Sequence, residues 1–296
     1  DHPLYLLKPE QMIEDLGSLD GLQLNAAKME ITPQESLLHE QLLDRYSSIF
    51  EDKMPCYPPE GPIVHRIQLE PGSKPPFTPM YRMGPSEMAE LKNILIGLLE
   101  AGLIVPANSP FSSGCLLVPK HDGGWRLCID LRGLNKITVK SKYPLPRIDE
   151  LLERTAGAQY FTKLDLRHAF WQIRIAPEDI HKTAFSTPWG QYQWTVMPMG
   201  ASNSPATMQM YVNSLFGHMT GNSLPQISPD LQNPTFKDFP FQYDRSRKVH
   251  RTCVVVYLDD ILIFSKTFQD HLEDVAEALK VLQASHLSVK RSKVEW

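Results

Sequence analysis

The spacing of hydrophobic residues divides the chain into helix-forming and strand-forming segments. Apolar residues at helical intervals predict four helices, at Pro33–Phe50, Pro85–Gly102, about Pro205–Phe216 and about Gln269–Ser285. Short apolar runs predict strands at Tyr160–Leu166, continuing through the alternating Phe170–Ile175, and at Cys253–Val256 and Ile261–Phe264. Helices and strands in this mixed order predict an α+β fold, with helices outside antiparallel or mixed sheets.

The first two helices have apolar stripes, which predict a face packed against a core. The stripe of the first helix consists of Leu37, Leu38, Leu42, Leu43, Tyr46 and Phe50. The stripe of the second consists of Met88, Leu91, Ile94, Leu95 and Leu98.

Two adjacent acids lie at the tip of a predicted hairpin, in the segment Tyr257-Leu258-Asp259-Asp260. Two unit charges about 4 Å apart repel by about 1 kcal/mol in water and about 4 kcal/mol at an effective dielectric of 20. A hard divalent cation with oxygen ligands would remove this repulsion. Ordinary turn chemistry is the alternative interpretation of an isolated pair of acids.

A third acid, Asp165, lies inside the strand predicted at Tyr160–Leu166. Neighbouring strand side chains alternate between faces, so Asp165 is expected to face away from Leu164 and Leu166. An edge-strand acid pointing into solvent is the plainer interpretation. A strand with one Asp beside a hairpin with two, however, resembles the palm of a nucleotide polymerase.

This resemblance extends over five sequence blocks, which occur in the order found in the reverse transcriptase region of gypsy-class long-terminal-repeat retrotransposon Pol polyproteins. The blocks are Pro119–Lys136, Tyr143–Asp149, Leu164–Ile175, Met197–Thr207 and Tyr257–Lys266. They cover most of residues 62–296. The resemblance implies an RNA-directed DNA polymerase, a nucleotidyltransferase with right-hand fingers and palm that extends a primer on an RNA or DNA template with dNTPs.

The resemblance also implies a catalytic site for two Mg²⁺ ions, with Mn²⁺ as an alternative. Two ions about 4 Å apart stabilise the attacking 3′-hydroxyl oxygen and the leaving oxygen together. Asp165 and Asp259 are the expected ligands, and the carbonyl of Leu166 is a further one. Asp260 is the third carboxylate, and its side chain need not reach the same ion as Asp259 because adjacent residues in extended chain diverge.

Seven further residues are expected, by resemblance, to contact the incoming nucleotide. They are Lys120, Arg126, His168, Ala169, Phe170, Met199 and Gly200. An Arg fork suits paired phosphate oxygens, while a Lys acts as a point charge. Phe170 stands where the family has an aromatic gate against a ribose 2′-hydroxyl, a position that is Tyr in many relatives. The plainer alternatives are solvated cations, a core aromatic and a gap-filling methionine.

Charge is distributed unevenly along the chain, whose net charge is −4. Residues 1–60 contain 12 of the 34 acidic and 4 of the 30 basic residues, which leaves 22 acidic and 26 basic residues in 61–296. The second part is therefore mildly basic. This surplus alone does not predict nucleic-acid binding, which is dominated by phosphate contacts.

Targeting signals are missing from the sequence. No apolar run approaches the about 20 residues of a membrane helix, and the beginning lacks the form of a signal peptide. The four cysteines form no CxxC pair and are expected to be reduced. These features favour an enzyme of the cytoplasm, in a retrotransposon particle, with the nucleus as an alternative and no membrane partner.

The expected organisation has three parts. Residues 1–60 form an acidic leader with one helix, and residues 61–84 form a proline-rich extended connector. Residues 85–296 hold the fingers, at about 85–140 and 176–202, and the palm, at about 141–175 and 203–296. Relatives also carry a protease, a thumb, a ribonuclease H domain and often an integrase. We expect none of these here, and a thumbless chain should hold primer and template weakly.

Three functions follow from these features. The first is a reverse transcriptase fragment of a retrotransposon polyprotein. The second is an inactive remnant or a domesticated nucleic-acid-binding module. The third is an interaction protein that uses the leader helix, which a pull-down with residues 1–60 would detect.

A long insert, about Thr220 to Thr252, separates the third predicted helix from the catalytic hairpin where relatives have a short loop. Structureless loops beyond about 15 residues are uncommon inside compact domains. We predict that the insert is retained non-coding sequence or marks a decayed copy. Sequencing the transcript tests the first version, because a mature message that encodes the insert contradicts it.

Overall fold

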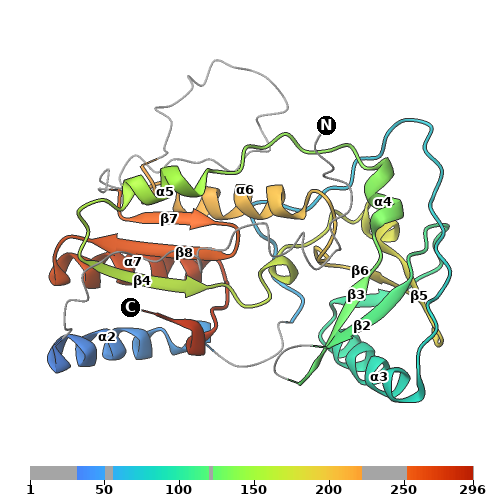
Figure 1. The fold of residues 1–296 in the computed structure, drawn as a ribbon, viewed down its shortest axis with the longest axis horizontal. Helices are drawn as coiled ribbons and strands as arrows, with labels where there is room; N and C mark the ends of the chain where they lie inside the picture. The colour runs from blue at the N-terminus through green and yellow to red at the C-terminus, as the bar shows by residue number, and fades with distance from the viewer. Residues whose placement is uncertain (1–31, 51–55, 120–122, 222–251, 296) are drawn as a thin grey trace, which may run out of the picture.

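The computed structural model describes residues 32–50, 56–119, 123–221 and 252–295. Lys120, most of the leader and most of the insert lie outside the described residues. The described chain forms two lobes joined by several crossings (Figure 1). None of its helices is long and apolar enough to cross a membrane.

The first lobe, lobe A, is built on an antiparallel sheet in the order β4-β8-β7 (Figure 1). β4 spans Tyr160–Asp165, β7 spans Val254–Tyr257 and β8 spans Asp260–Ser265. Side chains alternate between its two faces, as the strand period requires. Leu164, Val256 and Ile261 belong to one core, whereas Val255 and Leu262 belong to another.

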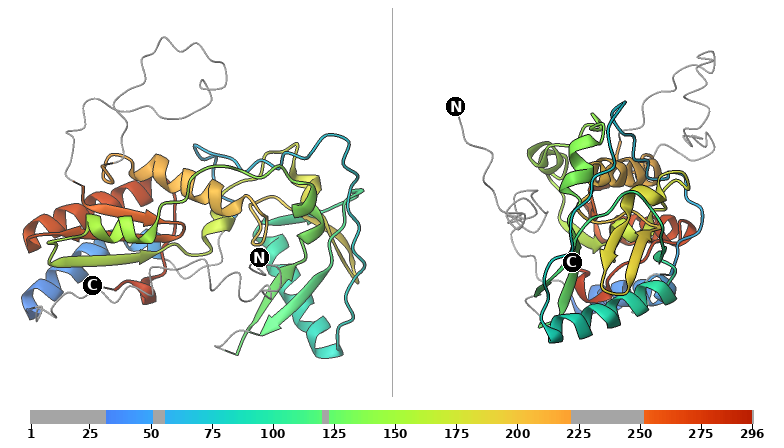
Figure 2. Two further views of the ribbon diagram at one scale, coloured as in Figure 1. Left: turned by 45° about the horizontal axis from the view of Figure 1, so that its top comes forward. Right: turned by 90° about the vertical axis from the view of Figure 1, so that its right-hand side faces the viewer.

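Helices cover both faces of this sheet. α2 (Pro33–Arg45), α6 (Ser204–Phe216) and α7 (Phe268–Ala284) contribute to the larger core, and α5 (Ile148–Arg154) covers the other face. The short 3-10 helix η2 (Ser47–Phe50) follows α2 into the same core. The helix of the acidic leader is thus packed into lobe A beside α7 (Figure 2).

The second lobe, lobe B, contains two small antiparallel sheets. One has the order β1-β6-β5, with β1 at Ile104–Pro106, β5 at Phe185–Thr187 and β6 at Gly190–Trp194. The other pairs β2 (Cys115–Pro119) with β3 (Trp125–Ile129). α3 (Pro85–Glu100) and α4 (Arg132–Ile137) pack with these strands, and η4 (Ile180–Thr183) lies beside β6.

The structure confirms the four predicted helices, the strand that carries Asp165 and the acidic hairpin. The strand extension through Phe170–Ile175 was wrong. The 3-10 helix η3 (Ala169–Gln172) occupies its first half, after a left-handed turn at His168 (φ 46°), and Arg174 and Ile175 form isolated bridges. Hydrophobic alternation could not reveal this turn, because it depends on backbone conformation.

The predicted stripe of the first helix was also partly wrong. Leu37 and Leu38 are 58% and 40% exposed, whereas His39 is fully buried with Leu42 and Leu43. The buried face therefore follows the spacing 39, 42, 43, and a polar residue belongs to it. In α3, Leu91, Leu95 and Leu98 are buried as predicted, but Met88 is exposed.

A buried polar chain explains why His39 faces the core. Ser265 Oγ donates to Asp274 Oδ2 at 2.7 Å and lies 3.0 Å from His271 Nδ1. In the neutral tautomer with its proton on Nδ1, His271 donates to Ser265 and accepts at Nε2 from Thr162 Oγ1, at 2.8 Å. Thr162 in turn accepts from His39 Nε2 at 3.3 Å. One directed chain thus links α2 to α7 through β4 and β8.

We predict that this burial makes the fold sensitive to acid. Burial, followed by the charge of Arg291, lowers the pKa of His39 to about 4. The unfolded chain therefore binds a proton between about pH 6.5 and pH 4 that the folded chain does not. The free energy of unfolding should fall as the pH falls through this window, by at most about 1.4 kcal/mol per pH unit for this group.

Urea unfolding at stepped pH tests this prediction. His39→Gln should make the pH dependence less steep, although His65, whose pKa burial also lowers to about 4, keeps part of it. His286→Gln, at an exposed position, is the control. Equal slopes in the unmodified chain and in His39→Gln would contradict the prediction.

Candidate active site

The pairing of β4 with β8 brings the predicted carboxylates together. Asp165 is the cross-strand partner of Asp260, and Asp260 also pairs with Tyr257 across the hairpin. Leu258 and Asp259 form the two-residue turn between β7 and β8. Leu258 has a φ of 54°, a left-handed conformation that costs a non-glycine residue about 1–2 kcal/mol. The three acids therefore lie at one end of the sheet.

A buried glutamine of α6 holds the strained turn. Gln209 Oε1 accepts from the Leu258 N–H at 2.9 Å, and its Nε2 donates to the Val256 carbonyl at 3.2 Å. From the other side, the Leu166 N–H donates to the Asp259 carbonyl at 3.0 Å. The turn is thus attached both to α6 and to the residue that follows Asp165.

Two lysines balance part of the negative charge. Lys163 Nζ lies 3.4 Å from Asp260 Oδ1, and both side chains are largely buried. Lys293, in the 3-10 helix η6 (Arg291–Lys293), donates to Asp165 Oδ2 at 2.7 Å, and its side chain is 53% exposed. The Lys293 contact is therefore the one that solvent and ions can reach.

Asp259 differs from an ordinary surface acid. Its pKa is raised to about 6, first by burial and then by the neighbouring charges of Asp260 and Asp165, while a backbone hydrogen bond and the charge of Lys293 lower it. The ionised form is thus unfavourable without a nearby positive charge. Perturbed carboxyl groups of this kind are common at functional sites.

The donor set fits a hard divalent cation in its chemistry, since it consists of carboxylate oxygens. In the described part of the chain, no group of three or more Asp, Glu, His or Cys side chains is arranged to hold a metal ion. The Lys293 ammonium group occupies a position beside Asp165 that a bound cation would also need. A cation bound between Asp165 and Asp259 would therefore displace the Lys293 ammonium group.

The structure places three of the expected nucleotide contacts next to Asp165. His168 stacks on Trp171 with 4.7 Å between ring centroids, and Ala169 is buried. Phe170 is partly buried and packs against the larger core of lobe A. Its plainer role as a core aromatic is therefore real, and the proposed gate is an additional role.

The other expected contacts lie in lobe B or at its junction with lobe A. Arg126 is exposed on β3, and Met199 is 44% exposed before the turn at Gly200 (φ 87°). Among the described residues, no hydrogen bond or ion pair joins these three residues to the carboxylates, so their roles stay predictions. Lys120 is outside the described residues.

Three site residues were not found from the sequence. Lys163 is two residues before Asp165 on the same strand face, so strand periodicity contained a signal for it. Lys293 and Gln209 meet the hairpin only through tertiary packing. Sequence spacing has no signal for such contacts.

Comparison with known proteins identifies the fold. A crystal structure of prototype foamy virus protease-reverse transcriptase matches 99% of this chain and 34% of its own, with a TM-score of 0.68 and 22% identity. A foamy viral protease-reverse transcriptase in complex with double-stranded DNA covers 97% of this chain and 52% of its own, with a TM-score of 0.68. These matches show a polymerase-like fingers-and-palm architecture.

Sequence relatives are transposon polyproteins. The retrovirus-related Pol polyprotein from transposon 297 of Drosophila melanogaster is 32% identical over 99% of this chain, which spans 26% of that relative. The transposon Tf2-3 polyprotein of Schizosaccharomyces pombe is 31% identical over 73% of the chain and 14% of its own length. The chain thus spans about a quarter or less of these relatives. The family described as reverse transcriptase (RNA-dependent DNA polymerase) matches residues 118–296, and this chain belongs to that family.

Proposed function

We propose that this chain is the polymerase region of a retrotransposon polyprotein and catalyses RNA-directed DNA synthesis. Lobe A is the palm and lobe B supplies the fingers. The observation that carries the proposal is the register that sets Asp165 opposite Asp260, with Asp259 in the turn beside them. The three acids lie at one end of the sheet, and two lysines balance part of their charge. This arrangement suits a reaction in which metal ions and phosphate groups bind at the same site.

Asp165 and Asp259 would hold the ions, which when bound stabilise the attacking and leaving oxygens of the phosphoryl transfer. Lys163 keeps Asp260 paired within the palm at 3.4 Å. Gln209 fixes the position of the hairpin relative to α6 by its two hydrogen bonds to the hairpin backbone. Phe170, just beyond Asp165 in the chain, is the proposed barrier against a ribose 2′-hydroxyl.

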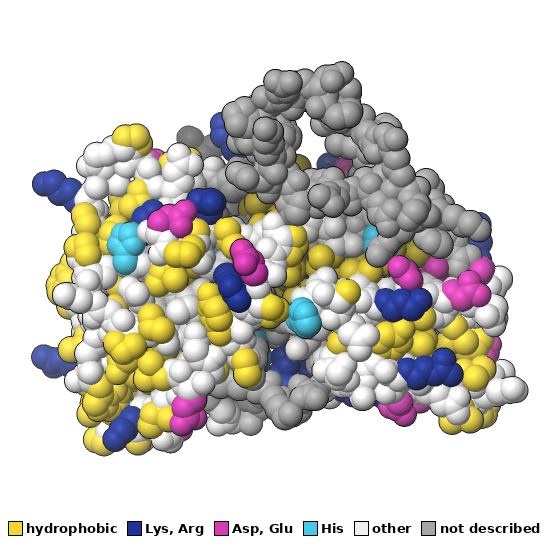
Figure 3. Space-filling model, turned by 180° about the vertical axis from the view of Figure 1, so that it is seen from behind, with side chains coloured by type: hydrophobic (Ala, Val, Ile, Leu, Met, Phe, Trp, Pro, Cys, Tyr) yellow, Lys and Arg dark blue, Asp and Glu magenta, His cyan; other side chains and the backbone are white. Residues whose placement is uncertain are grey.

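Primer and template are the proposed partners, with dNTPs as substrates. Solved foamy viral protease-reverse transcriptases include one in complex with double-stranded DNA and one in complex with an RNA/DNA hybrid. On the face seen from behind, basic and acidic side chains are interspersed (Figure 3). This mixture agrees with the modest basic surplus of the sequence, and we propose that the duplex binds beside the three carboxylates rather than on the face seen in this view.

We predict that Asp259→Asn stabilises the metal-free protein at pH 7. Because its pKa is raised in the folded chain, protonated Asp259 is compatible with the fold and ionised Asp259 destabilises it. The fold is therefore free of this destabilisation below about pH 4 and bears all of it once the pH has risen through about 6. The neutral amide should recover about 1–2 kcal/mol of unfolding free energy above pH 6 and nothing below pH 4.

Thermal unfolding with and without MgCl₂ tests whether Asp259 is a ligand of the ion. Mg²⁺ should stabilise the unmodified chain, because it binds the folded state, and should have little effect on Asp259→Asn. Asp149→Asn, at an exposed position of α5, is the matched control and should respond to Mg²⁺ like the unmodified chain. Equal Mg²⁺ responses in all three proteins would exclude Asp259 as a ligand.

Primer extension tests the proposed activity. On an RNA template with Mg²⁺ and dNTPs, we expect incorporation by the unmodified chain and by Asp149→Asn, and none above background by Asp259→Asn. Activity that survives in Asp259→Asn would place the chemistry elsewhere. If the unmodified chain is inactive, and stays inactive when a thumb is added and residues 220–252 are deleted, the inactive-remnant interpretation is correct.

A further inference from the structure

Two asparagines join the segment around α4 to the turn that precedes α6. Asn135 Nδ2 donates to the Gly200 carbonyl at 2.8 Å, and its Oδ1 accepts from the Ser202 N–H at 2.9 Å. Asn203 makes the reverse connection. Its Nδ2 donates to the Val139 carbonyl at 2.8 Å, and its Oδ1 accepts from the Ser141 N–H at 3.0 Å. We call these two residues the asparagine clasp.

The clasp lies where the chain passes twice between the lobes. Residues 138–147 lead from α4 in lobe B to α5 in lobe A, and residues 195–203 lead from β6 in lobe B to α6 in lobe A (Figure 1). Asn203 belongs to the second crossing and bonds the backbone of the first, whereas Asn135, in α4 just before the first crossing, bonds the backbone of the second. The relative position of the two crossings is therefore set by side-chain amides, each of which both donates and accepts.

Packing holds one end of the turn and leaves the other end open. Ala201 is buried in a core cluster with Leu131 and Leu134. Gly200 has a φ of 87°, and a Cβ added there would meet no heavy atom within 4 Å. Met199 beside it is 44% exposed. At Met199 and Gly200 the space is open, and the Asn135 side chain holds the Gly200 carbonyl to α4.

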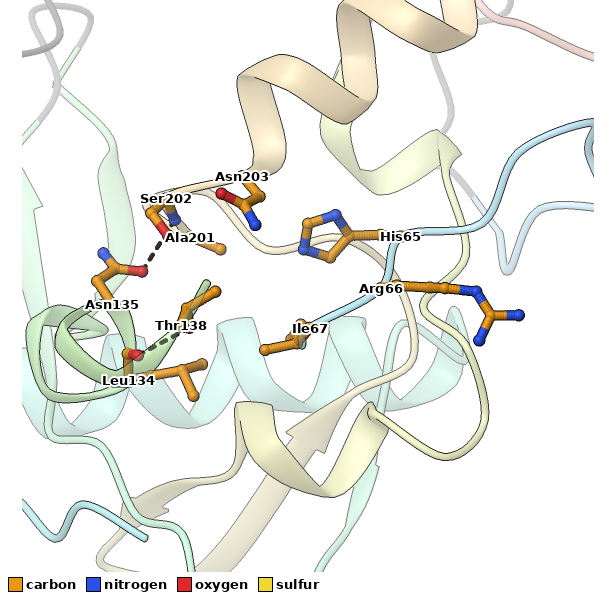
Figure 4. A pocket seen from close by; sticks show the side chains of 9 residues that line it. All are labelled: His65, Arg66, Ile67, Leu134, Asn135, Thr138, Ala201, Ser202 and Asn203. Atoms are coloured by element: carbon orange, nitrogen blue, oxygen red, sulfur yellow. Dashed lines mark hydrogen bonds between the residues drawn. The ribbon is translucent and has the colours of Figure 1, made fainter. Parts of the chain in front are cut away.

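The inner side of the turn borders a small pocket (Figure 4). Asn135, Ser202 and Asn203 line it together with His65 from the connector. Ser202 Oγ is buried there and makes no hydrogen bond to any described residue.

We propose that Asn135 and Asn203 are positioning residues for nucleotide binding. They fix the backbone position of the Met199–Gly200 turn, which in the proposed function contacts the incoming nucleotide. They make no contact with the three carboxylates among the described hydrogen bonds. The inference rests on the proposed function, in which this turn contacts the nucleotide. In this proposal the side-chain amide of Asn135 determines the backbone conformation of the turn, and alanine, which has no amide, cannot replace it. Aspartate replaces it only in part, because it keeps an acceptor for the Ser202 N–H but has no donor for the Gly200 carbonyl.

Steady-state kinetics on poly(rA)–oligo(dT) with the full chain tests the positioning role. In Asn135→Ala, KM for dTTP should rise about tenfold, as expected for loss of one or two hydrogen bonds, while kcat changes by less than about twofold. Asn135→Asp should show a similar rise, and Asn203→Ala a smaller one. Asn93→Ala, exposed on α3, is the control and should match the unmodified chain. A fall in kcat with an unchanged KM would overturn the proposal.

Hydrogen exchange supplies a readout that does not need activity. The Ser202 amide should exchange faster in Asn135→Ala than in the unmodified chain and should stay protected in Asn135→Asp, while the amides of β4 and β8 are unchanged in both. Unaltered Ser202 exchange in Asn135→Ala would overturn the clasp. If the unmodified chain incorporates no dTTP, the proposed function fails on its own, and the exchange result still decides whether the clasp holds the turn.

Discussion

The register between β4 and β8 is the constraint on which the other features of lobe A depend. It sets Asp165 opposite Asp260 on one face of the sheet and places Thr162 and Ser265 against His271 on the opposite face. A slip by one residue would exchange the faces of every side chain in the strand. The acid cluster and the polar chain to α2 and α7 would then be lost together, so chemistry and packing select the same alignment.

The acidic hairpin is locally unfavourable and is held by its surroundings. Leu258 is in a left-handed conformation, and Asp259 has a raised pKa because it is buried near two other acids. Gln209 from α6 and the Leu166 N–H fix the turn from two sides. Strain and like charges persist at a site only where the surrounding fold over-determines the conformation. Here the half-exposed Lys293 provides a positive charge beside Asp165.

Sequence reasoning succeeded where the pattern is local. Apolar period and the Asp-Asp pair predicted the helices, the hairpin and the strand of Asp165, and motif order predicted the family. It failed at His168, where a left-handed turn ends the strand, and at Leu37 and Leu38, which are exposed while His39 is buried. It also separated the leader helix from the palm, although both share one core. These errors arise because partners distant in sequence decide burial.

The segment that follows α7 lies along the outer edge of β4. Bridges join Lys163 to Glu295 and Leu166 to Val289, and the Lys290 N–H donates to the Asp165 carbonyl at 3.0 Å. An uncovered edge strand is a template for pairing with other chains. The strand that carries Asp165 is instead covered on both sides, by β8 and by this segment. The protection of this strand edge and the placement of Asp165 thus rest on the same few backbone contacts.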